Sequence, residues 1–346
     1  MANLADVAKA AGVSTTTASF VLNGHAESMR IAPQTAEKVF AAAQQLAYVP
    51  NIAAKRLIHA NNAVPEVVLI WLSSLHPTFL GAFISSAQEL ISEKKLREMN
   101  ITVRTPTLKR LKNPGRDFPS MNFNGGIASP QYDFEFEYIN HLSTKIPFVV
   151  LHVKSERHSN VVVNYYAAGR MAAEVFAAKG HRHVAVMHAK YLGFTSQLDE
   201  RATGFMDTCT AHGMTVDQLQ TPNSLECSLT AFAQEKAQEM LENGTLPEAI
   251  FIQDDSAAVS FATTLRSAGV KIPDDIEIIT YGDNYLSSIC SPSITTIDYP
   301  SEQLTYEALR LLSEHFVDPT MQPKRVTVTP TITFRQSCPK PDSWPD

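Results

Sequence analysis

The sequence predicts a small α-helical unit at the N-terminus and, after it, a larger α/β part made of two lobes. Apolar residues recur every three or four positions up to about residue 46, which is typical of helices. From residue 66 onward, short apolar strands alternate with helices, which is typical of doubly wound domains with parallel sheets. This second part, roughly 280 residues long, exceeds one typical domain, so two lobes are favoured over one.

The stretch "LADVAKAAGVSTTTASFVLNG" (residues 4–24) predicts two short helices joined at a glycine. Gly12 ends the first helix. Ser14 is a good N-cap for the second, because its side-chain oxygen can accept a free backbone N–H of the first turn. The residues expected to face the common core are Leu4, Val7, Ala8, Ala11, Ala18, Val21 and Leu22.

Four side chains of the second helix stay outside that apolar stripe: Thr15, Thr16, Ser19 and Phe20. Two helices joined through a glycine turn form the helix-turn-helix pattern, in which the second helix enters the DNA major groove with its N-terminal residues at the base edges. An ordinary αα-hairpin has the same turn and the same stripes. The two-helix pattern alone therefore leaves both interpretations open.

A third helix is predicted to begin at Pro33 and to share the same small core. Its expected core-facing residues are Ala36, Val39, Phe40, Ala43 and Leu46. Pro50 then breaks the chain, and residues 52–58 can form only two helical turns. Such a segment is expected to be disordered in isolation and to fold when a partner supplies the missing contacts.

The first 60 residues resemble the headpiece and hinge of lactose-repressor-family transcription factors, with "LADVAKAAGVSTTTASFVLNG" and "TAEKVFAAAQQLAYVPNIAAKRL" in register. The insert "HAESMRI" and the later "TYGDN" resemble the fructose repressor (catabolite repressor/activator) and sucrose repressor branch. The family usually has a serine immediately before the third helix, whereas this chain has Ala32. Alanine cannot provide the side-chain N-cap that serine would. The resemblance implies that Leu57 wedges into the minor groove at the operator centre.

The DNA-contacting residues expected on these grounds are Thr15, Thr16, Thr17, Ser19, Phe20, Asn23, Asn51, Ala54 and Leu57. Thr15, Thr16 and Phe20 are expected at base edges. Thr17, Ser19 and Asn23 are candidates for contacts to the DNA backbone. Residues 1–60 carry a net charge of +2 and the rest of the chain −8, as expected when only one small part touches phosphate.

Composition indicates a cytoplasmic protein. The chain is 44% hydrophobic, it has no apolar run long enough to span a bilayer, and it does not start with a signal peptide. Its cysteines, Cys209, Cys227, Cys290 and Cys338, lack metal-ligand or disulfide spacing and are expected to be buried thiols. No metal and no cofactor are expected.

The predicted domains are a helix-turn-helix headpiece (1–48), a hinge helix or linker (49–61) and a sensor (62–340). The first lobe is expected over 62–160 and 293–322, and the second over 161–292 and 323–340. This part resembles the two-lobed, periplasmic-binding-protein-like core of the same family in "KGHRHVAVM", "DERATGF" and "SPSITTID". Residues 95–165 fit poorly, with His152-Val153 and Asn164-Tyr165 standing where the family has other pairs.

In open α/β sheets, small molecules bind beyond the carboxyl ends of the strands. The candidates for effector contacts, placed by that rule and by the resemblance, are Leu75, His76, Phe79, Ser129, Asn164, Arg201, Asp254, Tyr281 and Asp283. Arg201, in the matched "RATG", can bind hydroxyls, a carboxylate or a phosphate through two parallel hydrogen bonds. Alternatives remain open: Phe79 in the helix core, Arg201 in a surface ion pair, and Asp254 and Asp283 as helix caps.

The chain contains no G-x-S-x-G, H-E-x-x-H, Walker or G-x-G-x-x-G motif, so no enzyme is expected. We therefore expect a dimeric, ligand-regulated transcription factor, a repressor controlled by a sugar or phosphosugar, because two identical heads read two half-sites of a palindromic operator. The alternative is a sugar-binding protein or hydrolase with an accessory helical domain.

Overall fold

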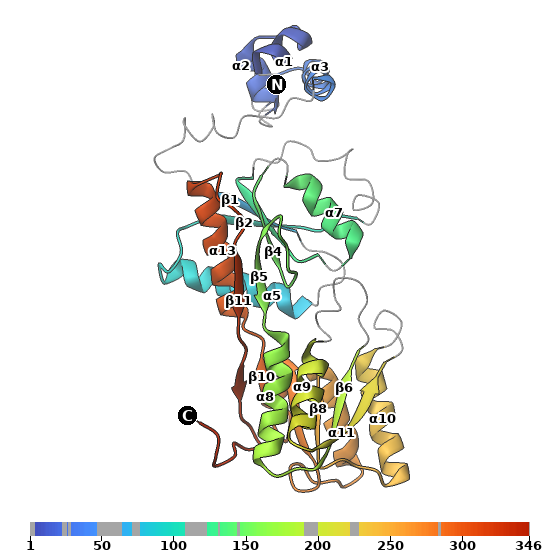
Figure 1. Cartoon of the computed structure of the whole chain (residues 1–346). Coiled ribbons are helices and arrows are strands. Elements are labelled where there is room, and N and C mark those ends of the chain that lie inside the picture. Colours follow the sequence, from blue (N-terminus) through green and yellow to red (C-terminus); the bar gives the residue numbers. More distant parts are fainter. Residues whose placement is uncertain are drawn as a thin grey trace.

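The computed structural model describes residues 4–22, 26, 29–46, 64–70, 77–107, 123–130, 132–143, 146–189, 200–221, 228–282 and 285–345. The predicted fold class is confirmed: a helical unit precedes two α/β lobes (Figure 1). Among the described residues, no helix is both long enough and apolar enough to cross a membrane.

The N-terminal head consists of α1 (Leu4–Ala11), α2 (Thr15–Leu22) and α3 (Pro33–Gln45) around one small core. The predicted turn is confirmed: Gly12 has a φ of +67°, a left-handed conformation that favours glycine, and Ser14 Oγ accepts the backbone N–H of Thr17 at 3.0 Å. The buried residues are Val7, Ala8, Ala18, Val21, Leu22, Val39 and Ala42.

One core prediction in the head is wrong. Phe40 is 47% exposed, whereas its neighbour Val39 is completely buried. A helix of the head can bury only one stripe, and here Val39 and Ala42 fill it. The predicted hinge helix (49–61) lies outside the described residues.

The sheet of the first lobe has six parallel strands in the order β11-β5-β4-β3-β1-β2. Their bounds are β1 (Glu66–Ile70), β2 (Asn100–Arg104), β3 (Gly125–Ala128), β4 (Phe148–Leu151), β5 (Ser159–Val163) and β11 (Arg325–Val328). Helices α5 (Pro77–Ser92) and α13 (Ser301–Val317) cover one face, and α7 (Asp133–Leu142) covers the other (Figure 1). Both faces of the parallel sheet are thus buried.

The sheet of the second lobe has the order β12-β10-β9-β8-β6-β7, with only β12 antiparallel. Its strands are β6 (His183–His188), β7 (Thr215–Gln220), β8 (Ala249–Ile252), β9 (Glu277–Gly282), β10 (Thr295–Asp298) and β12 (Thr331–Thr333). Its helices are α8 (Tyr165–Ala178), α9 (Glu200–Ala211), α10 (Leu229–Asn243), α11 (Asp255–Ser267) and α12 (Tyr285–Ile289). Val184 and Phe251 pack toward one helix layer, and Ala185 and Ile250 toward the other.

The chain passes between the lobes three times, after β5, after β10 and after β11. The observed lobe boundaries differ from the predicted ones, because strand pairing decides which sheet a segment joins. Residues 295–298, expected in the first lobe, pair in the second sheet as β10. Residues 161–163 and 325–328, expected in the second lobe, pair in the first sheet as parts of β5 and β11.

Candidate functional site

The surface of the head presents the first turn of α2. Thr15 and Thr16 are exposed, and Ser19 and Phe20 are partly buried. The hydroxyl of Thr17 lies 2.8 Å from Ser14 Oγ, so this side chain also belongs to the helix cap. The other predicted DNA contacts, Asn23, Asn51, Ala54 and Leu57, lie outside the described residues.

The carboxyl ends of the two sheets meet where the chain crosses between the lobes. Ser129, which follows β3, contacts His152 Nδ1 through its hydroxyl at 2.7 Å. His152 follows β4, and its Nε2 forms a short hydrogen bond with the hydroxyl of Tyr299, which follows β10. Burial lowers the pKa of His152 to about 4, so its imidazole is neutral near pH 7. We refer to this interlobe region as the cleft.

Arg201 lies at the start of α9 and forms the second wall of the cleft. The side chain is only 4% exposed, and its guanidinium carbon lies 4.4 Å from the centre of the Tyr281 ring and 5.5 Å from that of Tyr165. Cation–ring contacts at these distances are attractive, and more so when desolvated. The burial of Arg201 does not fit a surface ion pair, and the neighbouring Glu200 pairs with Lys154 at 3.2 Å; Asp199, the other partner considered, lies outside the described residues.

Two glycines explain how Arg201 reaches this position. A Cβ on Gly169 of α8 would lie 1.8 Å from the carbonyl oxygen of Arg201, and one on Gly204 would lie 2.2 Å from that of Tyr166. The backbones of α8 and α9 therefore touch at reciprocal glycines. In the R-x-x-G sequence, Arg201 supplies the positive charge in the cleft. Gly204, three residues later, lets α9 approach α8 closely.

Two of the predicted effector residues serve as helix caps. Asn164 Oδ1 accepts the backbone N–H of Ala167 at 3.0 Å, and Asp254 Oδ1 accepts that of Ala257 at 2.8 Å. Asn164 directly follows β5 and Asp254 is the second residue after β8, so their remaining polar atoms still lie at the carboxyl edge. Leu75, His76 and Asp283 lie outside the described residues, as does the side chain of Phe79.

Sequence reasoning missed two buried polar residues at the same edge. Gln253 follows β8 and is 3% exposed, and His188 ends β6 and is 2% exposed. Both amide atoms of Gln253 and Nδ1 of His188 have no hydrogen-bond partner among the described residues. Buried polar groups are normally paired, so these atoms point to a ligand or ordered water. The signal available in the sequence was a polar residue directly after an apolar strand.

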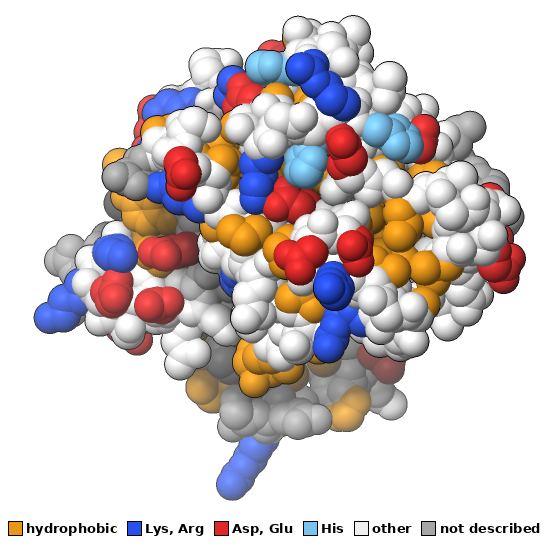
Figure 2. All heavy atoms as spheres, turned by 90° about the horizontal axis from the view of Figure 1, so that it is seen from below, with side chains coloured by type: hydrophobic (Ala, Val, Ile, Leu, Met, Phe, Trp, Pro, Cys, Tyr) orange, Lys and Arg blue, Asp and Glu red, His pale blue; other side chains and the backbone are white. Residues whose placement is uncertain are grey.

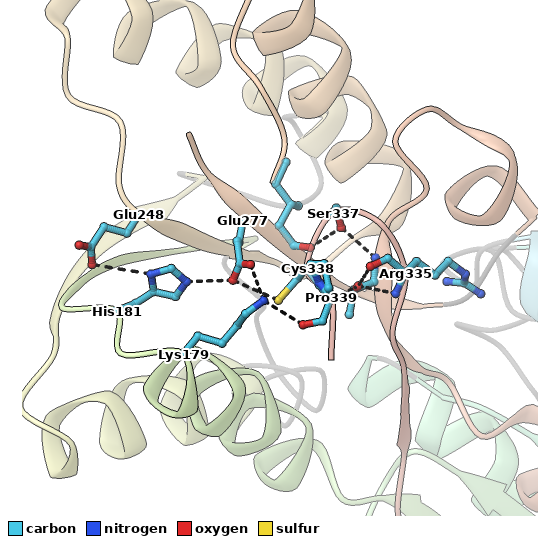
Figure 3. A network of polar contacts seen from close by, with 10 residues as sticks. Lys179, His181, Glu248, Glu277, Arg335, Ser337, Cys338 and Pro339 are labelled. Atoms are coloured by element: carbon cyan, nitrogen blue, oxygen red, sulfur yellow. Dashed lines mark hydrogen bonds and ion pairs between the residues drawn. The ribbon is translucent and has the colours of Figure 1, made fainter. Parts of the chain in front are cut away.

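A second polar network lies at the opposite, amino edge of the second sheet (Figure 3). Glu277 accepts from Lys179 Nζ at 2.5 Å, and its carboxylate lies 2.8 Å from His181 Nε2 and 3.4 Å from the thiol of Cys338. These contacts fasten the C-terminal segment to the lobe. Figure 2 shows this face, where histidine and charged side chains intermingle. Among the described residues, no group of three or more His, Cys, Asp or Glu side chains is arranged so that it could hold a metal ion.

Comparison with known proteins finds two family models that match different parts of the chain. Residues 3–51 match the model of bacterial regulatory proteins of the lacI family, and residues 173–338 match the periplasmic binding protein-like domain. The head thus resembles the lacI family of bacterial regulatory proteins, and most of the second lobe resembles a periplasmic binding protein-like domain. The family is non-enzymatic, so the expectation that the chain is not an enzyme is confirmed.

The chain is 26% identical over 343 residues to the probable HTH-type transcriptional repressor ExuR of Bacillus subtilis, covering 97% of this chain and 98% of ExuR. A solved complex of the transcriptional regulator CelR with cellobiose matches 97% of this chain and all of its own, with a TM-score of 0.65 and 22% identity. The lac repressor dimer bound to operator and the anti-inducer ONPF matches 98% of this chain and 99% of its own, with a TM-score of 0.65 and 20% identity. Nothing in these comparisons supports the fructose and sucrose repressor branch.

Proposed function

We propose that this repressor binds palindromic operator DNA as a homodimer and is controlled by a small sugar or phosphosugar in the cleft. The observation that carries the proposal is the buried Arg201 guanidinium, held against two tyrosine rings at the carboxyl edge of the second sheet. Ligands of open α/β sheets bind at this edge. A planar guanidinium at this position is suited to bind a phosphate, a carboxylate or adjacent hydroxyls through two hydrogen bonds.

The chemistry around Arg201 favours a polyhydroxylated ligand. Gln253 offers one donor group and one acceptor, and His188 Nδ1 offers a further polar atom, none of them paired among the described residues. A sugar hydroxyl both donates and accepts, so it matches such a set. The cellobiose complex of the CelR regulator supports a sugar, and the branch resemblance of the sequence motivates including fructose, sucrose and their phosphates among the compounds tested.

The head is proposed to read DNA with Thr15, Thr16 and Phe20 at base edges and with Thr17, Ser19 and Asn23 at phosphates. The hinge segment contributes Asn51, Ala54 and the wedge residue Leu57. Two exposed threonines on the first turn of α2 support this assignment, since the recognition helix contacts bases with its N-terminal residues. Because the proposed function requires binding to operator DNA, we propose that the protein acts in the cytoplasm, where that DNA lies.

Apolar side chains on α12 support the homodimer. Tyr285, Leu286 and Ile289 are 75%, 46% and 55% exposed on one short helix. Single exposed apolar residues are ordinary, but a contiguous group marks an interaction surface. The solved lac repressor structure is a dimer bound to operator, so a second copy of this chain is the partner we propose.

The proposal is tested by a thermal-shift screen against sugars and phosphosugars, followed by binding to operator selected from a random DNA pool. We expect Arg201→Ala to bind operator like the parent and to lose the response to the identified effector. Arg170→Ala is the matched control, because that exposed arginine pairs with Glu174 at 3.0 Å on the outside of α8. An Arg201→Ala protein that still responds fully would place the sensing site elsewhere.

A further inference from the structure

His152 is held in an unfavourable backbone conformation. Its φ is +67°, and among the described residues only Arg30 and Lys94 are other non-glycine residues with positive φ. A left-handed conformation is unfavourable for a residue with a β-carbon, and such conformations cluster at functional sites. The contacts of the imidazole are therefore the first place to look for what holds the residue there.

Both nitrogens of that imidazole face hydroxyls from different parts of the chain. Nδ1 lies 2.7 Å from Ser129 Oγ in the first lobe, and Nε2 is bonded to the Tyr299 hydroxyl on the crossing between β10 and α13. A neutral imidazole donates at one nitrogen and accepts at the other. The directions of the two hydrogen bonds are therefore linked: a change of donor at Ser129 reverses the roles at Tyr299.

Tyr299 continues this connection into the second lobe. Its ring packs edge-on against Tyr281, with ring centres 6.5 Å apart and planes at 89°. The Tyr281 ring carries the Arg201 guanidinium at 4.4 Å. Tyr165, on the crossing after β5, packs against Tyr281 from another side at 6.1 Å. One continuous set of contacts thus joins Ser129 on the first wall of the cleft to Arg201 on the second.

We propose that Tyr299 is a positioning residue that sets the separation of the two lobes, through its hydrogen bond to His152 and its ring contact with Tyr281. It thereby fixes where Ser129 stands relative to Arg201 across the cleft. This inference rests on the proposed function of the cleft as the effector site. Tyr299 lies on a crossing between lobes, so a small shift of its ring changes the relation of the two walls.

The experiment measures the interlobe distance in the ligand-free protein. Fluorescent labels are attached through azide-bearing residues at the exposed positions of Glu98 in the first lobe and Glu242 in the second. We expect Tyr299→Phe, which keeps the ring and removes the hydroxyl, to shift the mean single-molecule energy transfer and to broaden its distribution. Tyr166→Phe is the control, because that exposed hydroxyl bonds Asp207 at 3.1 Å within the second lobe and so makes no contact between the lobes.

A merely structural hydroxyl would lower the melting temperature of Tyr299→Phe and leave the energy-transfer distribution unchanged, and that result would overturn the proposal. A second pair of variants keeps the test independent of folding. His152→Gln, which retains a donor and an acceptor, should restore a distribution nearer to the parent than His152→Ala. Equal distributions for these two variants would also count against it. Because no effector is added, these outcomes are separate from a sugar screen, whose failure would overturn the proposed function alone.

Discussion

Arg201 shows how one residue takes on a role that its neighbours in sequence do not reveal. Next to it stands Glu200, which suggests an ion pair, yet the guanidinium lies over the rings of Tyr165 and Tyr281 and the residue is 4% exposed. A desolvated cation–ring contact contributes roughly 2 kcal/mol. The rings therefore hold the guanidinium in place at a site from which most water is excluded, where its contacts to a ligand are strengthened.

At the residue scale, operator choice is expected to depend on Thr15, Thr16 and Phe20. Thr16→Ala removes one exposed side chain from the first turn of α2 and should relax discrimination at one or two positions of each half-site by on the order of 1 kcal/mol. Selection from a random DNA pool measures this preference. An unchanged preference in all three alanine variants would contradict the assignment.

Acid sensitivity is expected from buried histidines. Burial, together with the charge of Arg157, lowers the pKa of His158 to about 4, and burial alone does the same for His152. An unfolded histidine has a pKa of about 6.5, so the unfolded state binds more protons as the pH falls below that value. The folded state therefore has its full stability with respect to these two histidines above about pH 6.5. Its free energy of unfolding falls progressively as the pH is lowered toward 4.

Denaturant unfolding at pH 7.5 and pH 5 should show this loss, on the order of 2 kcal/mol for each histidine. His158→Gln preserves a polar group beside Asn140, which lies 2.8 Å from the imidazole, but removes the titration. The variant should therefore lose less stability between the two pH values than the parent does. An equal loss in both proteins would show that His158 does not contribute.

At the scale of elements, the contact between α8 and α9 depends on the absence of side chains. The atoms that a Cβ at Gly169 or Gly204 would meet are backbone atoms of the facing helix, which cannot move without the helix. By contrast, a Cβ on Gly81 of α5 would meet no heavy atom within 4 Å. Three glycines within helices thus have different reasons to be there, and only two of them are packing positions.

We expect Gly204→Ala to separate α8 from α9, lower the free energy of unfolding by about 1–3 kcal/mol or more, and displace Arg201. The matched control Gly81→Ala should raise it by about 0.5–1 kcal/mol, because alanine is the better helix former. Chemical unfolding measures both changes. Equal effects for the two variants would refute the packing argument.

At the scale of the whole molecule, the head and the sensor differ in charge, and α12 carries the surface that we propose for a second copy. Residues 1–60 carry +2 and the remainder −8, so attraction to phosphate is confined to the head. If effector and operator bind to different states of the dimer, each must change the affinity of the other by the same factor, typically ~1–3 kcal/mol. The proposed function therefore requires the cleft and the proposed dimer surface to act together.

The dimer prediction rests on α12. The double substitution Tyr285→Ser and Ile289→Ser removes apolar area from this helix and should shift the protein toward monomer in analytical ultracentrifugation, with weaker operator binding. Val317→Ser is the control, since Val317 is 84% exposed at the end of α13 and is not part of the α12 group. A double variant that remains as dimeric as the parent would place the interface elsewhere.

Local patterns in the sequence determined the head and the central strands. The stripe of Val7, Ala8 and Ala18 follows from helical spacing, and the cap at Ser14 from the chemistry of one hydroxyl. β1, β6 and β8 are among the short apolar runs that the sequence predicts as strands from residue 66 onward, because a strand buried on both faces is apolar throughout. The polar edge strand β7, "TVDQLQ", gave no such run and was not predicted.

Only the tertiary structure decided the cleft. His152 and Tyr299 are 147 positions apart, and Arg201 meets Tyr281 only because α9 and β9 belong to the same lobe. Side-chain periodicity reports which face of an element is buried, but not which distant element it meets. Phe40 and the lobe boundaries were mispredicted for that reason: the space left by neighbouring side chains, and the sheet that a strand joins, are properties of the folded chain.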